Sequence, residues 1–375
     1  MSKGKVLITG GAGFIGSHLA DRLLTTGYRV RVLDALVPQV HSKGRAEYLS
    51  NEVELIVGDI RDPAAVHRAL EATDAVFHLA AAVGVGQSTY EAVAYSSVNV
   101  IGTATLLEAL LKGSARPGRI VVASSMSVYG EGLYSCPTCG AQAPRLRPSE
   151  QLANHDWDLK CPVCTLPMEP QPTPETKPLA PTSVYAINKR DQEEMCLVIG
   201  RTVGIPTVAL RFFNVYGDRQ ALSNPYTGVA AIFSSALLNG QSPGVFEDGL
   251  QPRDFVHVSD VVEACILALE RTDVADAAVN IGTGQFTSLL QLLTLLKREI
   301  PEGREVQPKI LGRFREGDIR ACYADISRAR KTLGFVPKVS LSDGIRSLAR
   351  WVRLQASEYA GTAALDELVR FRLVE

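Results

Sequence analysis

Net charge is almost absent from this chain, and that absence narrows the kinds of partner it can have. Its 375 residues contain 39 lysines and arginines against 40 aspartates and glutamates. Proteins that bind nucleic acid or anionic membrane surfaces generally carry an excess or a stripe of basic residues. We therefore expect neither partner, and an anionic substrate would have to be met by a few local arginines.

Long apolar stretches are missing as well. No segment reaches the roughly 18 uncharged apolar residues that a membrane helix requires, and the N-terminus, MSKGKVLITGG, enters a strand without an apolar signal segment. We find no internal repeat and no heptad pattern. The sequence predicts a cytoplasmic protein with a substantial core, built as one large unit or as two domains that share an interface.

Cysteine is scarce, but its placement is informative. Four of the seven cysteines form two CPxC pairs, separated by residues 140–160. Two such pairs can present four thiolates to one ion, as in zinc ribbons, and they fit a reduced protein better than a secreted disulfide framework. We predict a structural Zn²⁺ site, because four-thiolate coordination leaves no open position for chemistry; unliganded thiols or disulfides are the alternative. The predicted ligands are Cys136, Cys139, Cys161 and Cys164.

Residues 1–34 predict a dinucleotide-binding unit. The apolar strand Lys5–Thr9 is followed by the turn GGAGFIG and then by an amphipathic helical stretch. Glycines at such a turn allow a tight bend and a close approach of the backbone to a pyrophosphate, while the helix N-terminus offers free N–H groups. The turn residues expected at the cofactor are Gly10, Gly13, Phe14, Ile15 and Gly16.

Asp34 indicates which dinucleotide is bound. It ends the next strand, YRVRVLD, where a carboxylate can accept hydrogen bonds from the adenosine ribose and repels a 2′-phosphate. NAD(H) is therefore favoured over NADP(H), although Asp34 could also be a simple strand-end cap. Asp59 and Ile60 follow a later strand and are candidates for contact with the adenine, with an ordinary loop acid as the alternative for Asp59.

Strand-like and helix-like segments alternate through the first half of the chain. Helices are expected at 63–72 and 99–111, between the strand-like runs VELIVGDI, DAVFHLAA and GRIVVASS. This rhythm is typical of an α/β fold with a Rossmann-type, doubly wound parallel sheet.

Tyr185 and Lys189, in the motif YAINK, form a candidate catalytic pair. They stand four residues apart on a helix expected to begin near Thr182 or Ser183, so both side chains project from one face. A lysine beside a phenol is expected to lower the pKa of that phenol, and a bound oxidised nicotinamide would lower it further. Tyr185 is therefore a candidate general acid and base.

Taken together, TGGAGFIG, HLAA, SSMSVYG, YAINK, RFFNVYG and PRDFVHVSDV resemble the extended short-chain dehydrogenase/reductase family, in particular its nucleotide-diphosphate-sugar epimerases and dehydratases. The resemblance covers roughly residues 3–350 outside the cysteine-rich insert. It implies a Rossmann-type NAD domain at 1–213, interrupted by a zinc-ribbon insert at 131–175. A smaller C-terminal α/β substrate domain would follow at 214–350, part of it returning to the sheet, and residues 351–375 stay an unassigned tail.

The resemblance also implies roles for single residues. Ser125 matches the serine that hydrogen-bonds the reacting hydroxyl, Tyr185 the base, and Lys189 the lysine that holds the nicotinamide ribose. Arginine is suited to a diphosphate because its guanidinium group donates two hydrogen bonds at once, although surface salt bridges are the alternative for the two arginines below. Further implied contacts are Leu79, Ala80, Ala81 and Asn99 for the cofactor, and Ser88, Asn214, Arg253, Arg315 and Asp318 for the substrate.

The residues before VYG bear on the type of reaction. Dehydratases and uronate decarboxylases of the family carry an acid there, whereas this chain has Met126 and Ser127, neither of which can act as a general acid. The run HLAAAVGVGQS can be laid on the corresponding loop of hexose 4-epimerases, with Val83 where some of them have a basic residue. We therefore expect NAD-dependent 4-epimerisation through a transient 4-keto intermediate; 4,6-dehydration and UDP-glucuronate decarboxylation or epimerisation are the alternatives.

The sugar and the assembly are implied only by resemblance. A cysteine-rich insert combined with ALRFFNVYGDRQALSNPYTGVAAIF resembles a subgroup that includes dTDP-L-rhamnose 4-epimerases, while UDP-glucose/galactose and UDP-glucuronate stay open. A homodimer through helices near 95–112 and 183–199 is implied as well, although their apolar faces could equally be core. Because the insert lies between Ser125 and Tyr185, we also expect that it shapes the sugar pocket or its access route.

A non-enzymatic function is the competing class. A Rossmann domain could serve as a dinucleotide sensor, with the ribbon as a binding module. The Tyr185/Lys189 pair, the neutral charge and the absence of interleaved aromatic and basic residues argue against it.

Overall fold

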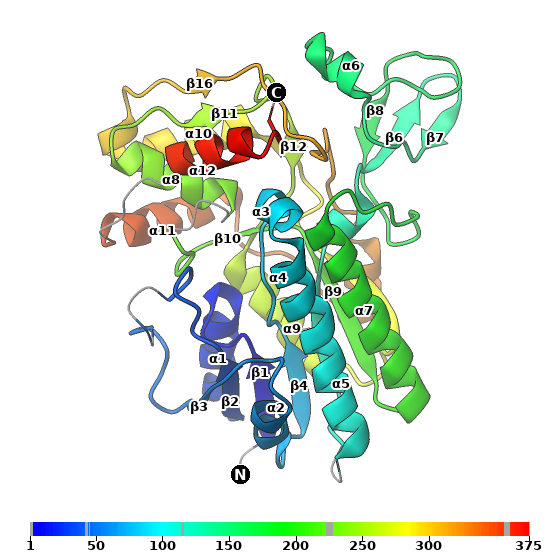
Figure 1. The fold of residues 1–375 in the computed structure, drawn as a ribbon, viewed down its shortest axis with the longest axis vertical. Helices are drawn as coiled ribbons and strands as arrows, with labels where there is room; N and C mark the ends of the chain where they lie inside the picture. The colour runs from blue at the N-terminus through cyan, green and yellow to red at the C-terminus, as the bar shows by residue number, and fades with distance from the viewer. Residues whose placement is uncertain are drawn as a thin grey trace.

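A seven-stranded, entirely parallel sheet forms the centre of the molecule (Figure 1), in the order β14-β9-β5-β4-β1-β2-β3. The computed structural model describes residues 3–41, 44, 46–113, 116–222, 228–355 and 361–374, and only the backbone of 361–365. The strands are β1 (Lys5–Thr9), β2 (Arg29–Asp34), β3 (Glu54–Val57), β4 (Ala75–His78), β5 (Ile120–Ser125), β9 (Thr207–Phe212) and β14 (Ala277–Ile281). The predicted doubly wound α/β fold is confirmed.

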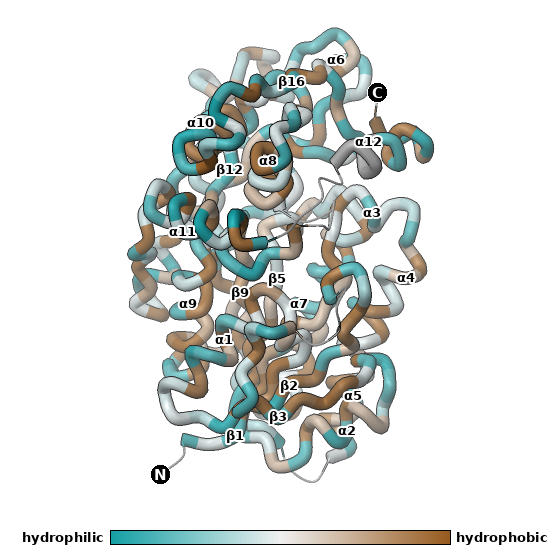
Figure 2. Tube along the Cα trace, turned by 90° about the vertical axis from the view of Figure 1, so that its left-hand side faces the viewer, coloured by the Kyte–Doolittle hydropathy of each residue, from teal (hydrophilic) through white to brown (hydrophobic). Residues whose placement is uncertain are grey.

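Helices cover both faces of this sheet. On one face α1 (Phe14–Thr25) packs beside α9 (Val258–Glu270), and on the other α5 (Gly102–Lys112) lies between α2 (Pro63–Leu70) and α7 (Val184–Val203). The strands are apolar along their length because both faces are buried, as their brown colour in Figure 2 shows. Strand order reverses between β1 and β4, and the crevice outside the carboxyl ends of these strands is where ligands bind in such sheets.

A smaller C-terminal unit stands above the carboxyl edge of the sheet (Figure 1). Its core contains Phe233, Leu292, Leu296, Ile345 and Leu348, from three packed helices. The elements are β10 (Asn214–Tyr216), α8 (Val229–Leu238), β11 (Gly244–Val245), β12 (Pro252–Arg253), β13 (Phe255–His257), β15 (Thr287–Ser288), α10 (Leu289–Glu299), β16 (Lys309–Ile310) and α11 (Leu341–Arg353). Between them α9 and β14 return to the main sheet. Helix α11 runs through residue 351, so the predicted tail begins inside a helix.

The cysteine-rich insert is a compact three-stranded antiparallel unit beside the C-terminal unit (Figure 1). Its elements are β6 (Leu133–Cys136), β7 (Gly140–Gln142), α6 (Ser149–Ala153) and β8 (Glu169–Gln171). Its core joins the cysteines to Tyr134, Leu159, Met168 and Ala321. The last of these comes from the C-terminal unit, so the insert does not pack on itself alone.

One helical run is longer and more apolar than the sequence led us to expect. Helix α4 (Ala92–Ser96), a π-helical turn (Ser97–Ile101) and α5 follow without a break, and by length and composition alone residues 92–112 could cross a membrane. The expectation that no such stretch exists is therefore wrong on this criterion. The run is amphipathic, however: Leu106, Leu107 and Leu110 are buried in the core that α5 shares with α2 and the sheet. This is how a core helix of a folded domain packs.

Candidate active site

The glycine turn between β1 and α1 has the shape that the sequence predicts. Gly10 has a φ of +72°, and a Cβ atom there would lie 2.8 Å from the backbone of Ala80. A Cβ on Gly16 would meet the Gly10 carbonyl oxygen at 2.4 Å, so only glycine allows helix and strand to approach this closely. Gly13 precedes α1 without any side-chain cap, which leaves N–H groups at the helix start for an anion.

Asp34 lies at the end of β2 beside this turn. Its carboxylate accepts hydrogen bonds from the backbone N–H groups of Ala12 and Leu36, both at 2.9 Å. Asp34 therefore caps the end of the strand and also lies where a ribose contact is expected.

A cavity of about 740 Å³ opens from this turn toward Tyr185. Its volume suits a dinucleotide and part of a second ligand. The cofactor residues predicted from the sequence line it with one exception, Asn99, whose side chain is buried and bonds both backbone groups of Ala82 at 2.8 and 3.0 Å. The predicted residues on the cavity wall are Gly10, Gly13, Phe14, Ile15, Gly16, Asp34, Asp59, Ile60, Leu79, Ala80, Ala81, Ser125, Tyr185, Lys189 and Asn214.

Tyr185, the candidate catalytic tyrosine, lies in the first turn of α7. Ser183 caps this helix by accepting a hydrogen bond from the Ala186 N–H at 3.1 Å, and the Tyr185 N–H donates to the Ser88 hydroxyl at 3.0 Å. Ser88 is buried and does not line the cavity. The structure thus places Ser88 behind Tyr185, away from the position of a substrate contact.

Tyr185 and Ser125, which stands at the end of β5, both line the cavity, and Ser125 acts on the pKa of the Tyr185 hydroxyl. Burial raises the pKa of Tyr185 to about 12, and the Ser125 hydrogen bond lowers it in part. The expectation that Lys189 depresses this pKa is wrong for the protein without its cofactor. The reason is that the Lys189 ammonium group is hydrogen-bonded to Gln192.

The Lys189 side chain points toward Gln192 on its own helix. Gln192 belongs to a buried polar network that includes Thr103 of α5 and His78 of β4. Its ammonium group donates to Gln192 Oε1 at 2.8 Å, and burial lowers the pKa of Lys189 to about 8. Gln192 Nε2 in turn donates to Thr103 Oγ1 at 2.9 Å, which lies 2.8 Å from His78 Nε2. Burial lowers the pKa of His78 to about 3, so this imidazole is neutral at physiological pH.

Neither of the two residues before VYG, Met126 and Ser127, has a carboxylate, and the fold gives neither side chain the role of an acid. Met126 is buried in a 3₁₀ turn, and the Ser127 hydroxyl donates to Ser125 Oγ at 2.9 Å. Tyr129 of the VYG motif is fully buried, with its hydroxyl donating to Asn280 Oδ1 at 2.7 Å and accepting from Arg211 at 2.8 Å. This tyrosine is structural.

The predicted diphosphate residues lie outside the cavity wall, in the C-terminal unit. Arg253 donates to the carbonyl oxygens of Ile319 and Arg320, each at 2.8 Å. Arg315 pairs with Asp318 at 2.8 Å, and its guanidinium carbon lies 4.8 Å from the centre of the Phe246 ring. We call Phe246, Arg253, Arg315 and Asp318 the nucleotide end.

Two residues that contact predicted site residues were missed by the sequence analysis. Phe246 sits in VFEDG, and only folding brings its ring to Arg315. Gln192 could have been found, because it stands three residues after Lys189 and therefore shares its helix face.

The C-terminal segment connects the two sides of the cleft. Helix α12 (Gly361–Arg370) lies over α3 (Val85–Tyr90), where the rings of Tyr90 and Phe371 stack with centroids 4.3 Å apart. Three residues after Phe371, Val374 forms an antiparallel β-bridge with Arg315. The tail, which the sequence analysis left unassigned, therefore bridges helix α3 and the nucleotide end.

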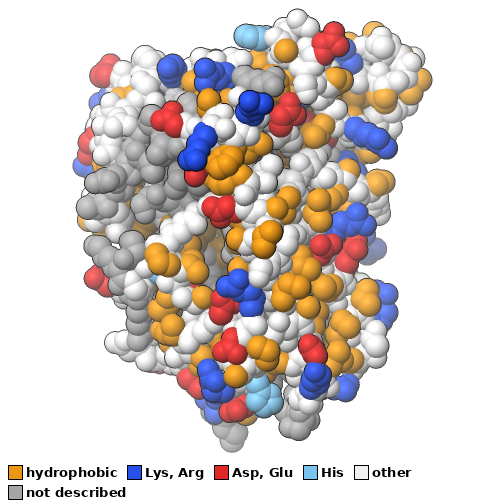
Figure 3. Space-filling view, in the orientation of Figure 1, with side chains coloured by type: hydrophobic (Ala, Val, Ile, Leu, Met, Phe, Trp, Pro, Cys, Tyr) orange, Lys and Arg blue, Asp and Glu red, His pale blue; other side chains and the backbone are white. Residues whose placement is uncertain are grey.

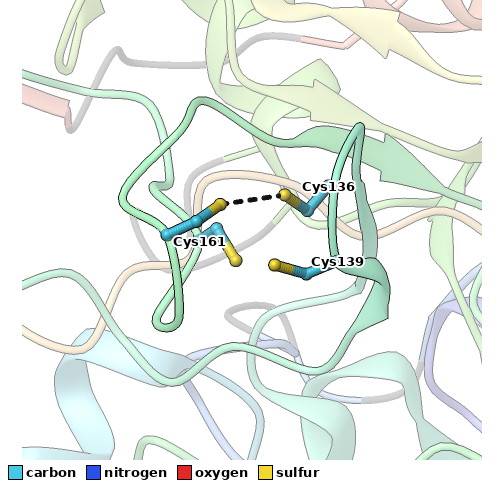
Figure 4. A group of neighbouring side chains, drawn as sticks. Cys136, Cys139 and Cys161 are labelled. Atoms are coloured by element: carbon cyan, nitrogen blue, oxygen red, sulfur yellow. Dashed lines mark hydrogen bonds between the residues drawn. The ribbon is translucent and has the colours of Figure 1, made fainter.

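The four predicted zinc ligands are brought together. Their Sγ atoms all lie within 4.8 Å of one another, and Cys136 Sγ is 3.4 Å from Cys164 Sγ. Figure 4 shows Cys136, Cys139 and Cys161 directing their sulfur atoms toward a common point. Tetrahedral Zn–S bonds of about 2.3 Å require sulfur separations of about 3.8 Å, so the donor set fits zinc with little adjustment.

Comparison with known proteins points to one family. The NAD dependent epimerase/dehydratase family profile matches residues 6–151 and 163–282, and the interruption falls inside the insert. A dTDP-L-rhamnose 4-epimerase of Burkholderia thailandensis is 36% identical over 353 residues, which cover 93% of this chain and 94% of that protein. A putative UDP-glucose 4-epimerase of Methanocaldococcus jannaschii is 34% identical over 350 residues, covering 93% and 98%. A UDP-N-acetyl-alpha-D-glucosaminuronate decarboxylase of Bacillus cytotoxicus is 30% identical, covering 94% and 98%.

Solved structures agree with these relatives. The UDP-glucose 4-epimerase of Thermotoga maritima, determined with UDP-glucose, has a TM-score of 0.75 at 33% identity, over 93% of this chain and 99% of that one. The UDP-glucuronic acid 4-epimerase of Bacillus cereus, determined with UDP-glucuronic acid and NAD, has a TM-score of 0.73 at 27% identity, over 93% and 99%.

Proposed function

The chain belongs to the NAD-dependent epimerase/dehydratase family, and from this premise we propose that it interconverts the C4 epimers of a nucleotide-diphosphate sugar. The observation that carries the proposal is the presence of Tyr185, Ser125 and Lys189 together on the wall of the dinucleotide cavity, with no carboxylate at Met126 or Ser127. This arrangement can move the proton of one hydroxyl but offers no second acid at these positions.

Tyr185 and Ser125 have different roles at the C4 hydroxyl. Ser125 binds the hydroxyl and, as it already does for the phenol, stabilises negative charge on oxygen. Tyr185 as phenolate accepts the proton and later returns it. NAD, held by the glycine turn and Asp34, would supply the hydride acceptor and donor for C4.

Lys189 completes this set when the cofactor is present. Its ammonium group, which donates to Gln192 in this structure, would hold the nicotinamide ribose, and its charge, together with that of an oxidised nicotinamide, would lower the pKa of Tyr185 from the value that burial imposes. The pKa lowering expected from the sequence thus belongs to the loaded enzyme.

The first candidate substrate is dTDP-L-rhamnose. Support comes from the Burkholderia relative and from the cysteine-rich insert; UDP-glucose and UDP-glucuronate are supported by the other relatives and by the solved structures. Incubation with a panel of dTDP- and UDP-sugars, followed by ¹H NMR, tests the assignment. We expect one sugar to reach an equilibrium with its C4 epimer; formation of a 4-keto-6-deoxy sugar or of CO₂ would point to a dehydratase or decarboxylase.

The metal and the assembly are part of the same proposal. One Zn²⁺ held by the four clustered cysteines is structural, because its coordination is closed.

A homodimer is supported by apolar side chains that are exposed on α4, on the π-helical turn that follows it, and on α7. Figure 3 shows a hydrophobic surface over α5, which lies beside these elements. These side chains are Val93, Ile101, Ile187 and Val198. Seven free thiols suit the cytoplasm, where we place the protein.

A further inference from the structure

The insert docks at the nucleotide end of the C-terminal unit. Ser149 donates to the Glu316 carboxylate at 2.9 Å, and a Cβ atom on Gly312 would lie 3.3 Å from the His155 ring. Both contacts are made by residues that stand between the two CPxC pairs. A metal that joins the pairs therefore closes the loop from which these side chains project, and a closed loop costs less entropy to hold in place.

Arg147 is the centre of this contact. Its side chain is only 1% exposed, although it belongs to an insert loop at the surface of the molecule. The guanidinium group donates to Glu247 Oε1 at 2.8 Å and to the Asp318 carbonyl oxygen at 3.3 Å. A third hydrogen bond, to the Trp157 carbonyl oxygen at 2.8 Å, fixes Arg147 within the insert itself.

Of the two acceptors outside the insert, Asp318 belongs to the nucleotide end and Glu247 is adjacent to it in sequence. Glu247 follows Phe246 directly, and its N–H donates to the Arg313 carbonyl oxygen at 2.8 Å. Asp318 is the residue that pairs with Arg315. One buried guanidinium group therefore joins the loop that carries the aromatic ring to the segment that carries the arginine and the acid.

Arg320 provides a second link of the same kind. It pairs with Glu247 at 2.9 Å and Asp248 at 2.7 Å in the C-terminal unit, and with Asp158 of the insert at 3.0 Å. Its N–H donates to the buried carboxylate of Glu131 at 2.7 Å, at the base of the insert.

The cysteine cluster itself touches this segment through Ala321. That side chain is 1% exposed and packs with Tyr134, Leu159 and the cysteines. The two residues before it supply the carbonyl oxygens that hold the Arg253 guanidinium group. A continuous set of contacts thus runs from the metal cluster to a predicted diphosphate arginine.

We propose that the zinc insert positions the nucleotide end, with Arg147 as the positioning residue, so that it sets affinity for the nucleoside diphosphate part of the substrate. This deepens the proposed function and rests on it. The contacts described above lie at the nucleotide end, and the expectation that the insert shapes the sugar pocket stays a separate prediction. Sub-ångström placement of binding groups has large effects on affinity.

The test is calorimetric titration of Arg147→Met with dTDP and with UDP, and separately with NAD. In this variant Glu247 keeps Arg320 as a buried partner, so a folded protein is expected. We expect the better of the two nucleotides to bind about tenfold to a hundredfold more weakly, with NAD affinity unchanged. In turnover, KM for the nucleotide sugar rises while kcat stays close to the wild-type value. Arg145→Met, at an exposed position two residues away, is the matched control and should bind like wild type.

A second measurement uses the wild-type chain, in case the variant does not fold. Zinc is removed with a chelator, loss of the metal is measured, and retained NAD affinity shows that the Rossmann sheet is intact. Nucleotide affinity should fall with the metal and return when zinc is added back. Wild-type nucleotide affinity in folded Arg147→Met, or in zinc-free protein, would overturn the inference. Failure of the wild-type protein to bind either nucleotide would instead remove the proposed function.

Discussion

The backbone N–H of Tyr185 donates a hydrogen bond to the Ser88 hydroxyl at 3.0 Å, and this contact ties the first turn of α7 to α3. Ser88 is itself anchored, since its hydroxyl donates to the Val85 carbonyl oxygen at 2.7 Å. Ser88, which sequence resemblance assigned to the substrate, therefore contacts the backbone of the proposed base.

Ser88→Ala should lower kcat more than it changes KM. Loss of the hydroxyl leaves the Tyr185 N–H without its acceptor and frees the start of α7, so we expect kcat to fall about tenfold. Steady-state kinetics checks this. Thr89→Ala, at the exposed neighbouring position, should behave like wild type; a selective rise in KM for Ser88→Ala would favour direct contact with the substrate.

Ser125→Ala should move the pH dependence of kcat/KM. The Ser125 hydrogen bond lowers the pKa of Tyr185, so its removal raises that pKa and less phenolate is present at any given pH. The rising limb of the pH–rate profile is expected to shift to higher pH. A loss of about tenfold to a hundredfold should persist even on the plateau, because the oxygen charge loses a donor. An unshifted profile would show that Ser125 does not tune Tyr185.

Glu193→Gln should destabilise the protein. The buried Glu193 carboxylate pairs with Arg211 and accepts a hydrogen bond from Ser124 at 2.6 Å, so neutralising it leaves an uncompensated buried guanidinium group. We expect the free energy of unfolding to fall by about 3 kcal/mol, measured by urea denaturation. Glu194→Gln, whose exposed side chain pairs with Arg190 on the same helix, should change it by less than about 1 kcal/mol. Equal effects would contradict this account.

Ile101→Asp together with Ile187→Asp should yield a monomer. Both side chains are exposed, at 57% and 46%, on the surface proposed to join two copies of the chain. A carboxylate at the centre of such an interface would have to be desolvated without a partner. Light scattering should report a dimer for wild type and for Val336→Asp, which changes an apolar residue exposed elsewhere. A monomeric wild type would exclude the dimer.

Local pattern was sufficient for the sheet and for the cofactor turn. The βαβ rhythm and the glycines of GGAGFIG depend on contacts close in sequence, so β1 occurs at Lys5–Thr9 as expected. The spacing of the CPxC pairs was equally sufficient to predict the cysteine cluster.

Long-range contacts account for what the sequence could not predict. Helices α3 and α12 are short and are stabilised by each other, through rings that are far apart in the chain. The direction of the Tyr185 pKa depended on burial and on Lys189 turning to Gln192, and neither can be derived from the motif YAINK. The burial of Arg147 could not be predicted either, since its acceptors Glu247 and Asp318 lie in another unit.

The measurement that tests epimerisation most directly follows deuterium at C4 of the sugar. The substrate found by the panel is labelled at C4 and incubated with the protein in ordinary water, and the product is examined by NMR. If the hydride is removed and returned within one cavity, the C4 epimer keeps its deuterium and NADH does not accumulate. Tyr185→Phe should form it at least about a hundredfold more slowly, with NAD affinity retained. Loss of the label to water, or undiminished turnover by Tyr185→Phe, would contradict the account.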